Sequence, residues 1–349
     1  MKSRFFDRLL PLLVCVICLS ACSWFNKQTN TNTASTPPED KTEHRATFIA
    51  VGDIMLSRGI NAAILNAGDP NVVFKNTGEE FAKSDFNFAN LESPVSGDDS
   101  RIGKGLVFNA RKANIPPLLK NKFSMLTVAN NHSMDQGLKG LQYTRTYLDE
   151  VGIKHTGTGD NKEEAWKGAW VEANGIKIGF VGVSYASVND GGVTRNDYVA
   201  RIEDTDYLKR SIDDLRKQGC DFVFVAFHAG IEYTRRPEPH QIAFAHAAVD
   251  AGADAVIGAH PHWIQTTEKY KDKWIFYSLG NFIFDQPWPD TREGLTLKLS
   301  LYKQGKTTRI DSIELKPVMI ENRSVPRWAN PTEAATILKK IEITDPILK

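Results

Sequence analysis

From position 47 onward, short runs of β-branched and aromatic residues alternate with longer stretches in which apolar residues recur every three or four positions. The short runs are typical of buried strands, and the longer stretches are typical of amphipathic helices. Their alternation predicts a layered α/β domain whose helices lie outside the sheets. Core strands are expected at Thr47–Val51, Phe86–Asn90, Met125–Ala129, Phe222–Phe227 and Ala255–Gly258, and helices at Gly137–Val151, Asp206–Gln218 and Pro239–Ala251.

Turn signals divide other apolar segments into hairpins, because a two-residue turn of the Asn-Gly kind joins antiparallel strands. Hairpins are expected at Trp170–Val183 with a turn at Asn174-Gly175, at Ile264–Tyr277 with a turn near Lys271-Asp272, and at Leu295–Leu301 with Arg309–Leu315 around Gln304-Gly305. Crossovers combined with hairpins favour two packed mixed sheets over one parallel sheet. The weakly patterned segment 319–349 is expected to be a C-terminal extension with a helix at Pro331–Ile341.

The first 22 residues have the layout of an export signal. A basic start precedes the apolar run Leu9–Leu19, and Leu19-Ser20-Ala21-Cys22 follows. This is the pattern of a secretory signal peptide, here 1–21, and the apolar run is too short for a transmembrane helix, which needs about 20 residues. The last four residues resemble the lipobox of bacterial lipoproteins, which implies cleavage before Cys22 and lipidation of that cysteine. An ordinary secreted protein is the alternative interpretation.

Composition separates a tether from the domain that follows it. Asn26–Glu43 is rich in Asn, Thr, Ser and Pro, so residues 22–44 are expected to form a flexible tether before a domain at 45–318. Cys220 is the one cysteine after Cys22, which excludes a disulfide within the domain and predicts a buried thiol. With a formal net charge of +1 and 24% charged residues, nothing indicates nucleic-acid binding by bulk electrostatics.

Polar residues with metal-binding chemistry follow the C-terminal ends of the core strands. They are Asp53 after the first strand, Glu92 after the second, Asn131 and His132 after the third, His228 after the fourth, and His260 and His262 after the fifth. Strand ends of an α/β sheet share one rim, where ligands bind. Carboxylates, imidazoles and amide oxygens suit Mn, Zn, Fe or Mg. The pattern therefore predicts a metal centre at this rim.

Taken singly, most of these residues have an ordinary structural explanation. Asp53 after a glycine is typical of a turn or helix cap, Asn131 of a turn, and Glu92 of a solvated loop. A strand-end histidine such as His228 is more often hydrogen-bonded in a core. His260-Pro261-His262 is the stronger signal, because proline restricts the backbone between two imidazoles. The agreement of five strand ends favours the metal centre over these separate explanations.

The order of these motifs resembles the CapA family of poly-gamma-glutamate capsule biosynthesis proteins, which is related to calcineurin-like metallophosphoesterases. The resemblance runs from Thr47 to Pro317 and is carried by Gly52-Asp53, Asn90-Leu91-Glu92, Asn130–Asp135, His228–Tyr233, Gly258–His262 and Tyr277–Asp285. It implies the four-layer sandwich of that superfamily, an α/β fold of two mixed sheets flanked by helices. It also implies a site for one or two divalent metal ions, with Mn, Zn or Fe as candidates.

The resemblance further implies a role for each residue. Asp53 and His262 would bind the first ion, Glu92 would bridge both ions, and Asn131, His228 and His260 would bind the second. His132 would act as a general acid toward the leaving oxygen. Asp135 is interpreted as the residue that orients His132, with capping of the helix from Gly137 as an equal alternative. The superfamily motif Asp-x-His is replaced here by Asp53-Ile54-Met55, so the first ion is expected to have fewer protein ligands.

Other residues near the motifs have open roles. Glu232 and Asn281 are interpreted as substrate-binding residues, although Glu232 could instead contact metal or Arg235. Asn281, like Asp285, could also serve a turn. Three tryptophans are interpreted as core or rim packing rather than as a ligand platform, namely Trp263, Trp274 and Trp288.

Together these features predict a lipid-anchored protein of the cell envelope, facing the periplasm or the cell exterior, that acts in biosynthesis or export of an anionic surface polymer. Its metal site would hydrolyse a phosphoester. Two alternatives use the same rim: a non-hydrolytic subunit that binds the polymer beside a membrane synthase, and a hydrolase of the polymer's amide bonds. The expected partners are therefore polymer or phosphoester, synthase subunits and the membrane, without nucleic acid.

Overall fold

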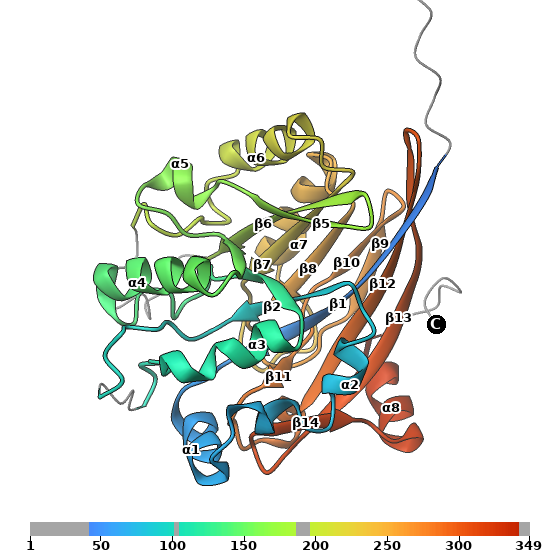
Figure 1. Cartoon of the computed structure of the whole chain (residues 1–349). Coiled ribbons are helices and arrows are strands. Elements are labelled where there is room, and N and C mark those ends of the chain that lie inside the picture. Colours follow the sequence, from blue (N-terminus) through green and yellow to red (C-terminus); the bar gives the residue numbers. More distant parts are fainter. Residues whose placement is uncertain (1–41, 101–104, 186–195, 342–349) are drawn as a thin grey trace, which may run out of the picture. The chain divides into compact units, whose positions relative to one another are not determined.

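The computed structural model describes residues 42–100, 105–185 and 196–341 of the chain (Figure 1). Cys22, the signal peptide and nearly all of the tether lie outside the described residues, so the expectations for them stay predictions. Among the helices that are described, none combines the length and the apolar character needed to cross a membrane.

The first sheet has eight strands and is built around β1 (Glu43–Ile54). Its order is β14 (Val325–Trp328), β13 (Thr307–Glu321), β12 (Glu293–Gln304), β1, β2 (Phe86–Leu91), β3 (Phe123–Thr127) and β4 (Lys154–Thr156), with β11 (Asn281–Ile283) paired to the end of β1. β1 to β4 are parallel, whereas β12, β13 and β14 are antiparallel. Because β13 continues across position 318 and pairs with β14, the predicted C-terminal extension contributes to this sheet.

The second sheet has six strands, in the order β5 (Ala169–Ala173), β6 (Ile176–Ser184), β7 (Phe222–His228), β8 (Ala255–Ala259), β10 (Lys273–Phe276) and β9 (Thr267–Tyr270). β6, β7, β8 and β10 are parallel, and β5 and β9 close the two edges as antiparallel hairpins. The prediction of two mixed sheets is confirmed, and so are the three expected hairpins.

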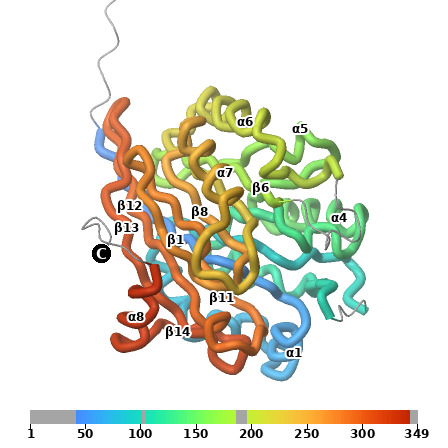
Figure 2. Tube along the Cα trace, turned by 180° about the vertical axis from the view of Figure 1, so that it is seen from behind, coloured from blue at the N-terminus to red at the C-terminus, as the bar shows by residue number. Residues whose placement is uncertain are grey.

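The helices expected in the sequence are present as α4 (Gly137–Glu150), α6 (Asp206–Lys217), α7 (Pro239–Asp250) and α8 (Pro331–Leu338). A 3-10 turn at Lys339–Ile341 extends α8, which lies beside β13 and is seen best from behind (Figure 2). The remaining helical segments are α1 (Arg58–Ala67), α2 (Gly78–Phe81), α3 (Pro116–Lys120), α5 (Lys162–Ala165) and 3-10 turns at Pro70–Phe74, Lys112–Asn114 and Pro289–Arg292.

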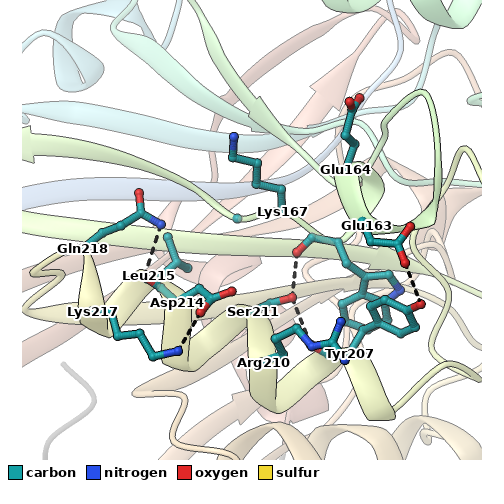
Figure 3. A pocket seen from close by; sticks show the side chains of 12 residues that line it. Glu163, Glu164, Lys167, Tyr207, Arg210, Ser211, Asp214, Leu215, Lys217 and Gln218 are labelled. Atoms are coloured by element: carbon teal, nitrogen blue, oxygen red, sulfur yellow. Dashed lines mark hydrogen bonds and ion pairs between the residues drawn. The ribbon is translucent and has the colours of Figure 1, made fainter. Parts of the chain in front are cut away.

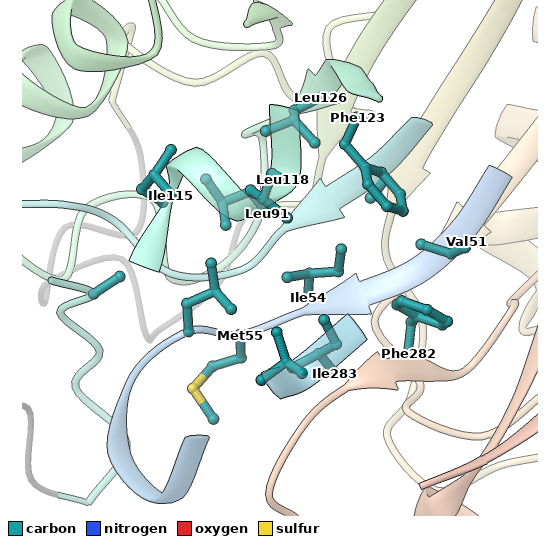
Figure 4. Packing of buried hydrophobic residues seen from close by; sticks show 14 of the residues in the cluster. Val51, Ile54, Met55, Leu91, Ile115, Leu118, Phe123, Leu126, Phe282 and Ile283 are labelled. Atoms are coloured by element: carbon teal, nitrogen blue, oxygen red, sulfur yellow. The ribbon is translucent and has the colours of Figure 1, made fainter. Parts of the chain in front are cut away.

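Alternation along β1 distributes its side chains to two hydrophobic layers, because successive residues of a strand point to opposite faces. Phe48 and Ala50 pack between the two sheets, while Ile49 and Val51 pack on the outer face of the first sheet. Helices α1 and α3 cover that outer face, with Leu118 among the packed side chains (Figure 4). A third layer joins the second sheet to α6 and α7. The predicted order of helix, sheet, sheet and helix is therefore confirmed.

A bulge in β1 places Asp53 at the end of the strand. The pairing with β2 shifts between Ala50 and Asp53, and the amide of Asp53 donates to the carbonyl of Gly280 at 3.1 Å. This close approach requires glycine at position 52, since a Cβ there would lie 1.8 Å from the Gly280 carbonyl oxygen.

We expect Gly52→Ala to lower the free energy of unfolding by about 1–3 kcal/mol, because the added methyl group displaces β11 from β1. Denaturant unfolding of the metal-free protein measures this change. Gly219→Ala is the control for backbone strain alone, because Gly219 has a φ of 86° and its added Cβ would meet no heavy atom within 4 Å. Wild-type stability in Gly52→Ala would contradict the close packing of β11 on β1.

Candidate metal centre

The predicted ligands come together where strands of both sheets end. The first sheet supplies Asp53 and Glu92, the loop between β3 and α4 supplies Asn131 and His132, and the second sheet supplies His228, His260 and His262. All seven residues are buried, with at most 4% of each exposed. The rim expected from the strand ends is therefore present, and it is built from two sheets rather than one.

Two donor sets share the carboxylate of Glu92. One set is Asp53, Glu92 and His262, the other is Glu92, His228 and His260, and the ligand atoms of each set lie within 4.8 Å of one another. Asn131 joins the second set, because its Oδ1 lies 2.8 Å from Nε2 of His228. That nitrogen lies 3.1 Å from Nδ1 of His260. The side chains are thus grouped as the family resemblance implied, and their binding of a first and a second ion stays a prediction.

The carboxylate of Glu92 has the strongest need for a cation. Glu92 is 0% exposed, and neither its Oε1 nor its Oε2 has a hydrogen-bond partner among the described residues. Burial and the neighbouring charges of Asp53 and Glu232 raise the pKa of Glu92 well above its usual range. A buried carboxylate without partners is strongly destabilising unless a metal ion or a proton neutralises it. The residues present therefore fit one or two divalent cations bound at Glu92.

His228, His260 and Asp53 are in the protonation states that metal binding requires. Burial lowers the pKa of His228, and burial together with the nearby His228 and His262 lowers the pKa of His260 further. Both rings are therefore neutral at neutral pH. Burial alone would raise the pKa of Asp53, but its contacts with His228 and His262 hold that pKa well below the usual value. Asp53 is thus ionised.

Each histidine of the donor sets contacts a partner through one ring nitrogen, and such partners fix the orientation of a metal-binding ring. His228 Nδ1 lies 3.0 Å from Asn90 Nδ2, His260 Nε2 lies 3.0 Å from the Tyr185 hydroxyl, and His262 Nδ1 lies 2.9 Å from Asn281 Oδ1. Sequence reasoning assigned no role to Asn90 or Tyr185. The sequence could have indicated that Asn90 lies at the site, because it stands two residues before Glu92 and strand residues two apart share a face.

Asn281 lies behind His262, on the protein side of the ring. It is 0% exposed, and its amide nitrogen donates to Gln286 Oε1 at 3.0 Å and to the Thr291 carbonyl at 2.9 Å. Its contacts are thus those of a residue that orients a ligand. The substrate contact expected for Asn281 stays a prediction.

Met55 stands where the superfamily motif has a histidine, and it is packed in the hydrophobic layer outside the first sheet (Figure 4). The residue is 0% exposed, and its Sδ accepts the backbone N–H of Ser57 at 3.1 Å. Among the described residues, the first donor set consequently contains three acidic or histidine side chains, and the expected number of ligands to the first ion stays a prediction.

His132 is held by Asp135 beside the donor sets. Nδ1 of His132 lies 2.7 Å from Oδ2 of Asp135, which also accepts the backbone N–H of Phe108 at 2.6 Å. Nε2 of His132 lies 3.8 Å from Oε1 of Glu92. The N-cap of α4 is Gln136, so the geometry favours the orienting role of Asp135 over helix capping. A histidine held by a carboxylate in this way is suited to proton transfer.

A pocket of about 390 Å³ opens beside the donor sets. His132 and His262 line it, together with the predicted substrate-binding residue Glu232. Arg235, the alternative partner considered for Glu232, is paired with Asp290 instead. Glu232 therefore lines the pocket without pairing with Arg235, and its substrate contact stays a prediction.

The three tryptophans occupy different environments. Trp274 is buried between the sheets, and Trp263 lies against the guanidinium of Arg235 at 4.8 Å. Trp288 is 52% exposed and lines the pocket. The expectation of core or rim packing fits all three, but Trp288 is also open to a ligand.

A second cavity, of about 560 Å³, lies between α5 and α6 (Figure 3). It shares no lining residue with the pocket at the metal centre. Several of its polar groups satisfy one another: the Tyr207 hydroxyl donates to Glu163 at 3.2 Å, and Lys217 pairs with Asp214 at 2.9 Å (Figure 3). None of the predicted site residues lines it.

Comparison with known proteins places the motifs in a family. The family model described as bacterial capsule synthesis protein PGA_cap matches residues 47–286. The chain belongs to this family. Capsule biosynthesis protein CapA of Bacillus anthracis is 31% identical over 319 residues, covering 89% of this chain and 76% of the relative. PGA biosynthesis protein CapA of Bacillus subtilis (strain 168) is 31% identical over 282 residues, covering 79% of this chain and 74% of the relative.

The fold of this CapA-type protein also has solved counterparts. A calcineurin-like phosphoesterase from Bacillus subtilis superposes with a TM-score of 0.50 at 14% identity, covering 86% of this chain and 97% of that one. At this identity the likeness concerns the fold alone. It confirms the calcineurin-like sandwich that the family resemblance implied.

In the metal-free protein, we expect Glu92→Gln to raise the free energy of unfolding at neutral pH by about 1–3 kcal/mol, because it removes a buried charge. The folded-state pKa of Glu92 is raised, so the wild type loses stability as pH rises above the usual pKa of glutamate, about 4.3. With Mn²⁺ or Zn²⁺ the order reverses, because bound ions stabilise only the wild type.

Thermal unfolding at pH 5 and pH 8, with chelator or with metal, measures both effects. Glu314→Gln is the matched control, because Glu314 is exposed on β13. Its substitution should change neither the pH dependence of stability nor the stabilisation by metal. Equal stabilisation of wild type and Glu92→Gln by metal would contradict the role of Glu92 as a ligand.

Proposed function

We propose that this protein is a metal-dependent phosphoesterase of the cell envelope that serves the formation of a capsule polymer of the poly-gamma-glutamate kind. The observation that carries the proposal is Glu92, a buried carboxylate that two donor sets share and that has no hydrogen-bond partner among the described residues. A shared carboxylate of this kind suits a two-metal site for phosphoryl transfer. The polymer is inferred from relatives whose names refer to capsule and PGA biosynthesis.

Divalent ions bound there would polarise a phosphoryl oxygen and activate a water molecule for attack. The chain's own residues prepare the surroundings of this reaction. His132, held at 2.7 Å by Asp135, would give a proton from Nε2 to the leaving oxygen. Burial of the whole cluster keeps bulk water away, so its charges act on the reacting group with little screening.

Met55 favours a second candidate function, a non-hydrolytic accessory subunit that binds the polymer beside a membrane synthase. A first donor set of three protein groups would hold its ion less firmly than a set with the motif histidine. Metal-loaded protein that hydrolyses no phosphoester, combined with site variants that still block capsule export in cells, would identify this function.

We also propose that Cys22 carries a lipid anchor and that the domain faces the periplasm or the cell exterior. The support is the apolar run Leu9–Leu19, the lipobox-like Leu19-Ser20-Ala21-Cys22 and the polar tether that follows. Such a tether would hold the domain near membrane-bound partners without restricting its orientation.

Two histidine variants test the hydrolytic site. His260→Ala is expected to lose both bound metal and hydrolysis, because it removes a ligand of the second donor set. His132→Asn is expected to keep its metal but to lower kcat by about 10²–10⁴-fold, as loss of a general acid does. Metal content is measured by mass spectrometry, and activity with 4-nitrophenyl phosphate and bis(4-nitrophenyl) phosphate.

The control is His246→Ala, because His246 lies on α7, contacts Glu268 at 2.9 Å and should leave both readings unchanged. Full hydrolytic activity in His260→Ala would contradict the proposed metal-dependent reaction.

Cys22→Ser is expected to release the protein from the membrane fraction and to abolish labelling with a palmitate analogue, since acyl chains supply the anchor. Cys220→Ser is the control, because Cys220 is a buried free thiol in the domain. Membrane association and labelling that persist in Cys22→Ser would rule out the anchor.

A further inference from the structure

Two runs of neighbouring rings line the pocket beside the candidate metal centre, with Tyr233 and Trp288 in an edge-on arrangement. The first passes from His132 to Phe108, whose ring centroids are 3.9 Å apart, and on to the guanidinium of Arg58, 4.5 Å from the Phe108 centroid. The second run passes from His262 through Tyr233 to Trp288. The ring centroids of His262 and Tyr233 are 6.2 Å apart, and those of Tyr233 and Trp288 are 5.1 Å apart. All of these residues line the one pocket, so ring faces extend outward from the donor sets.

Phe284 links the two runs. Its ring centroid lies 6.1 Å from that of Phe108, in an edge-on arrangement, and 4.7 Å from that of His262. The guanidinium of Arg58 lies 5.9 Å from the same ring. The lining is therefore aromatic on more than one side.

Two of the residues that line the pocket are large, apolar and well exposed to solvent. Leu106 is 66% exposed and Trp288 is 52% exposed, and both line the pocket. Val107 and Ile231 are also exposed, and they directly neighbour the lining residues Phe108 and Glu232 in the sequence. Exposed apolar side chains that line a pocket are typical of a surface that binds a ligand.

The charges of the pocket do not suit a polyanion. Among its described lining residues, Arg58 is the one arginine or lysine, and its charge is already matched by an ion pair with Asp285. Glu232 adds a second carboxylate, so one cation faces two acids. Successive carboxylates of a polymer would meet like charge here, which costs affinity and disfavours that ligand.

We propose that this pocket takes a compact phosphoester whose organic group is a ring, with the ring stacked against Tyr233 and Trp288 and the phosphoryl group at the donor sets. The proposal rests on the phosphoesterase function above and narrows its substrate class. A volume of about 390 Å³ matches one small ligand rather than a polymer segment. The site then acts on a small ring-bearing phosphoester rather than on the carboxylate polymer itself.

Calorimetric titration of the full, Mn²⁺-loaded protein with three phosphonates tests this preference without requiring turnover. Phenylphosphonate, cyclohexylphosphonate and hexylphosphonate carry the same anionic group and six carbons each. The two ring ligands are expected to bind about three- to tenfold more tightly than hexylphosphonate, because a ring stacks on an aromatic face and loses fewer rotamers on binding.

Trp288→Ala is expected to remove this ring preference while leaving hexylphosphonate binding nearly unchanged. Because Trp288 is 52% exposed, the variant should fold, and Tyr233→Leu provides a second test of the same ring run. The matched control is Trp170→Ala, because Trp170 on β5 is 37% exposed and does not line the pocket.

Equal binding of all three phosphonates, or a ring preference that survives in both variants, would overturn the proposal and leave the phosphoesterase function standing. Phosphonate binding that does not depend on Mn²⁺ would instead defeat the metal-dependent function on which the proposal rests. A glutamate pentamer that displaces phenylphosphonate with similar affinity would assign the pocket to a polyanion, and would also overturn the proposal.

Discussion

Where strands of both sheets end, the protein buries the Glu92 carboxylate without giving either oxygen a hydrogen bond from the described residues, and it places a second carboxylate, Asp53, close by. Such burial is unfavourable unless positive charge is supplied. The surroundings would suit a cation, because the imidazoles of His228, His260 and His262 belong to the two donor sets and each has a partner at one ring nitrogen. The bulge in β1 and the close contact of Gly52 with Gly280 serve the same end, because they bring Asp53 to the rim.

Backbone strain gathers at the same place. His260 and His262 have φ values of 100° and 57°, and Tyr233 and Arg58 have 62° and 44°. Non-glycine residues adopt such conformations at a cost of about 1–3 kcal/mol each, and they persist where the surrounding structure enforces them. The strained turn through Pro261 places an imidazole in each donor set. Stability is therefore reduced at the residues that form the site and line its pocket.

Much of this arrangement was predictable because strands impose a period of two and end at a common edge. Those rules located the core strands, the hairpin turns and all seven residues of the rim, although they did not show that two sheets build it. Other residues of the site come from loops, whose sequences have no repeating pattern. Tyr185, Phe108 and Arg58 reach the site through tertiary packing, and no local spacing marks them. Asn281 stood in a recognised motif, but its place behind His262 depends on the pairing of β11 with β1.

The replacement of the motif histidine by Met55 affects the two donor sets unequally. The set with His228 and His260 also has Asn131, whereas the set with His262 has three protein groups. His262 is the histidine ligand that lines the pocket, and its ring begins one of the two aromatic runs. A metal position with fewer protein ligands keeps more coordination positions open for water or for a bound ligand. In the proposed reaction, the missing histidine would weaken the hold on one ion at the position where an entering phosphoryl oxygen would have to bind.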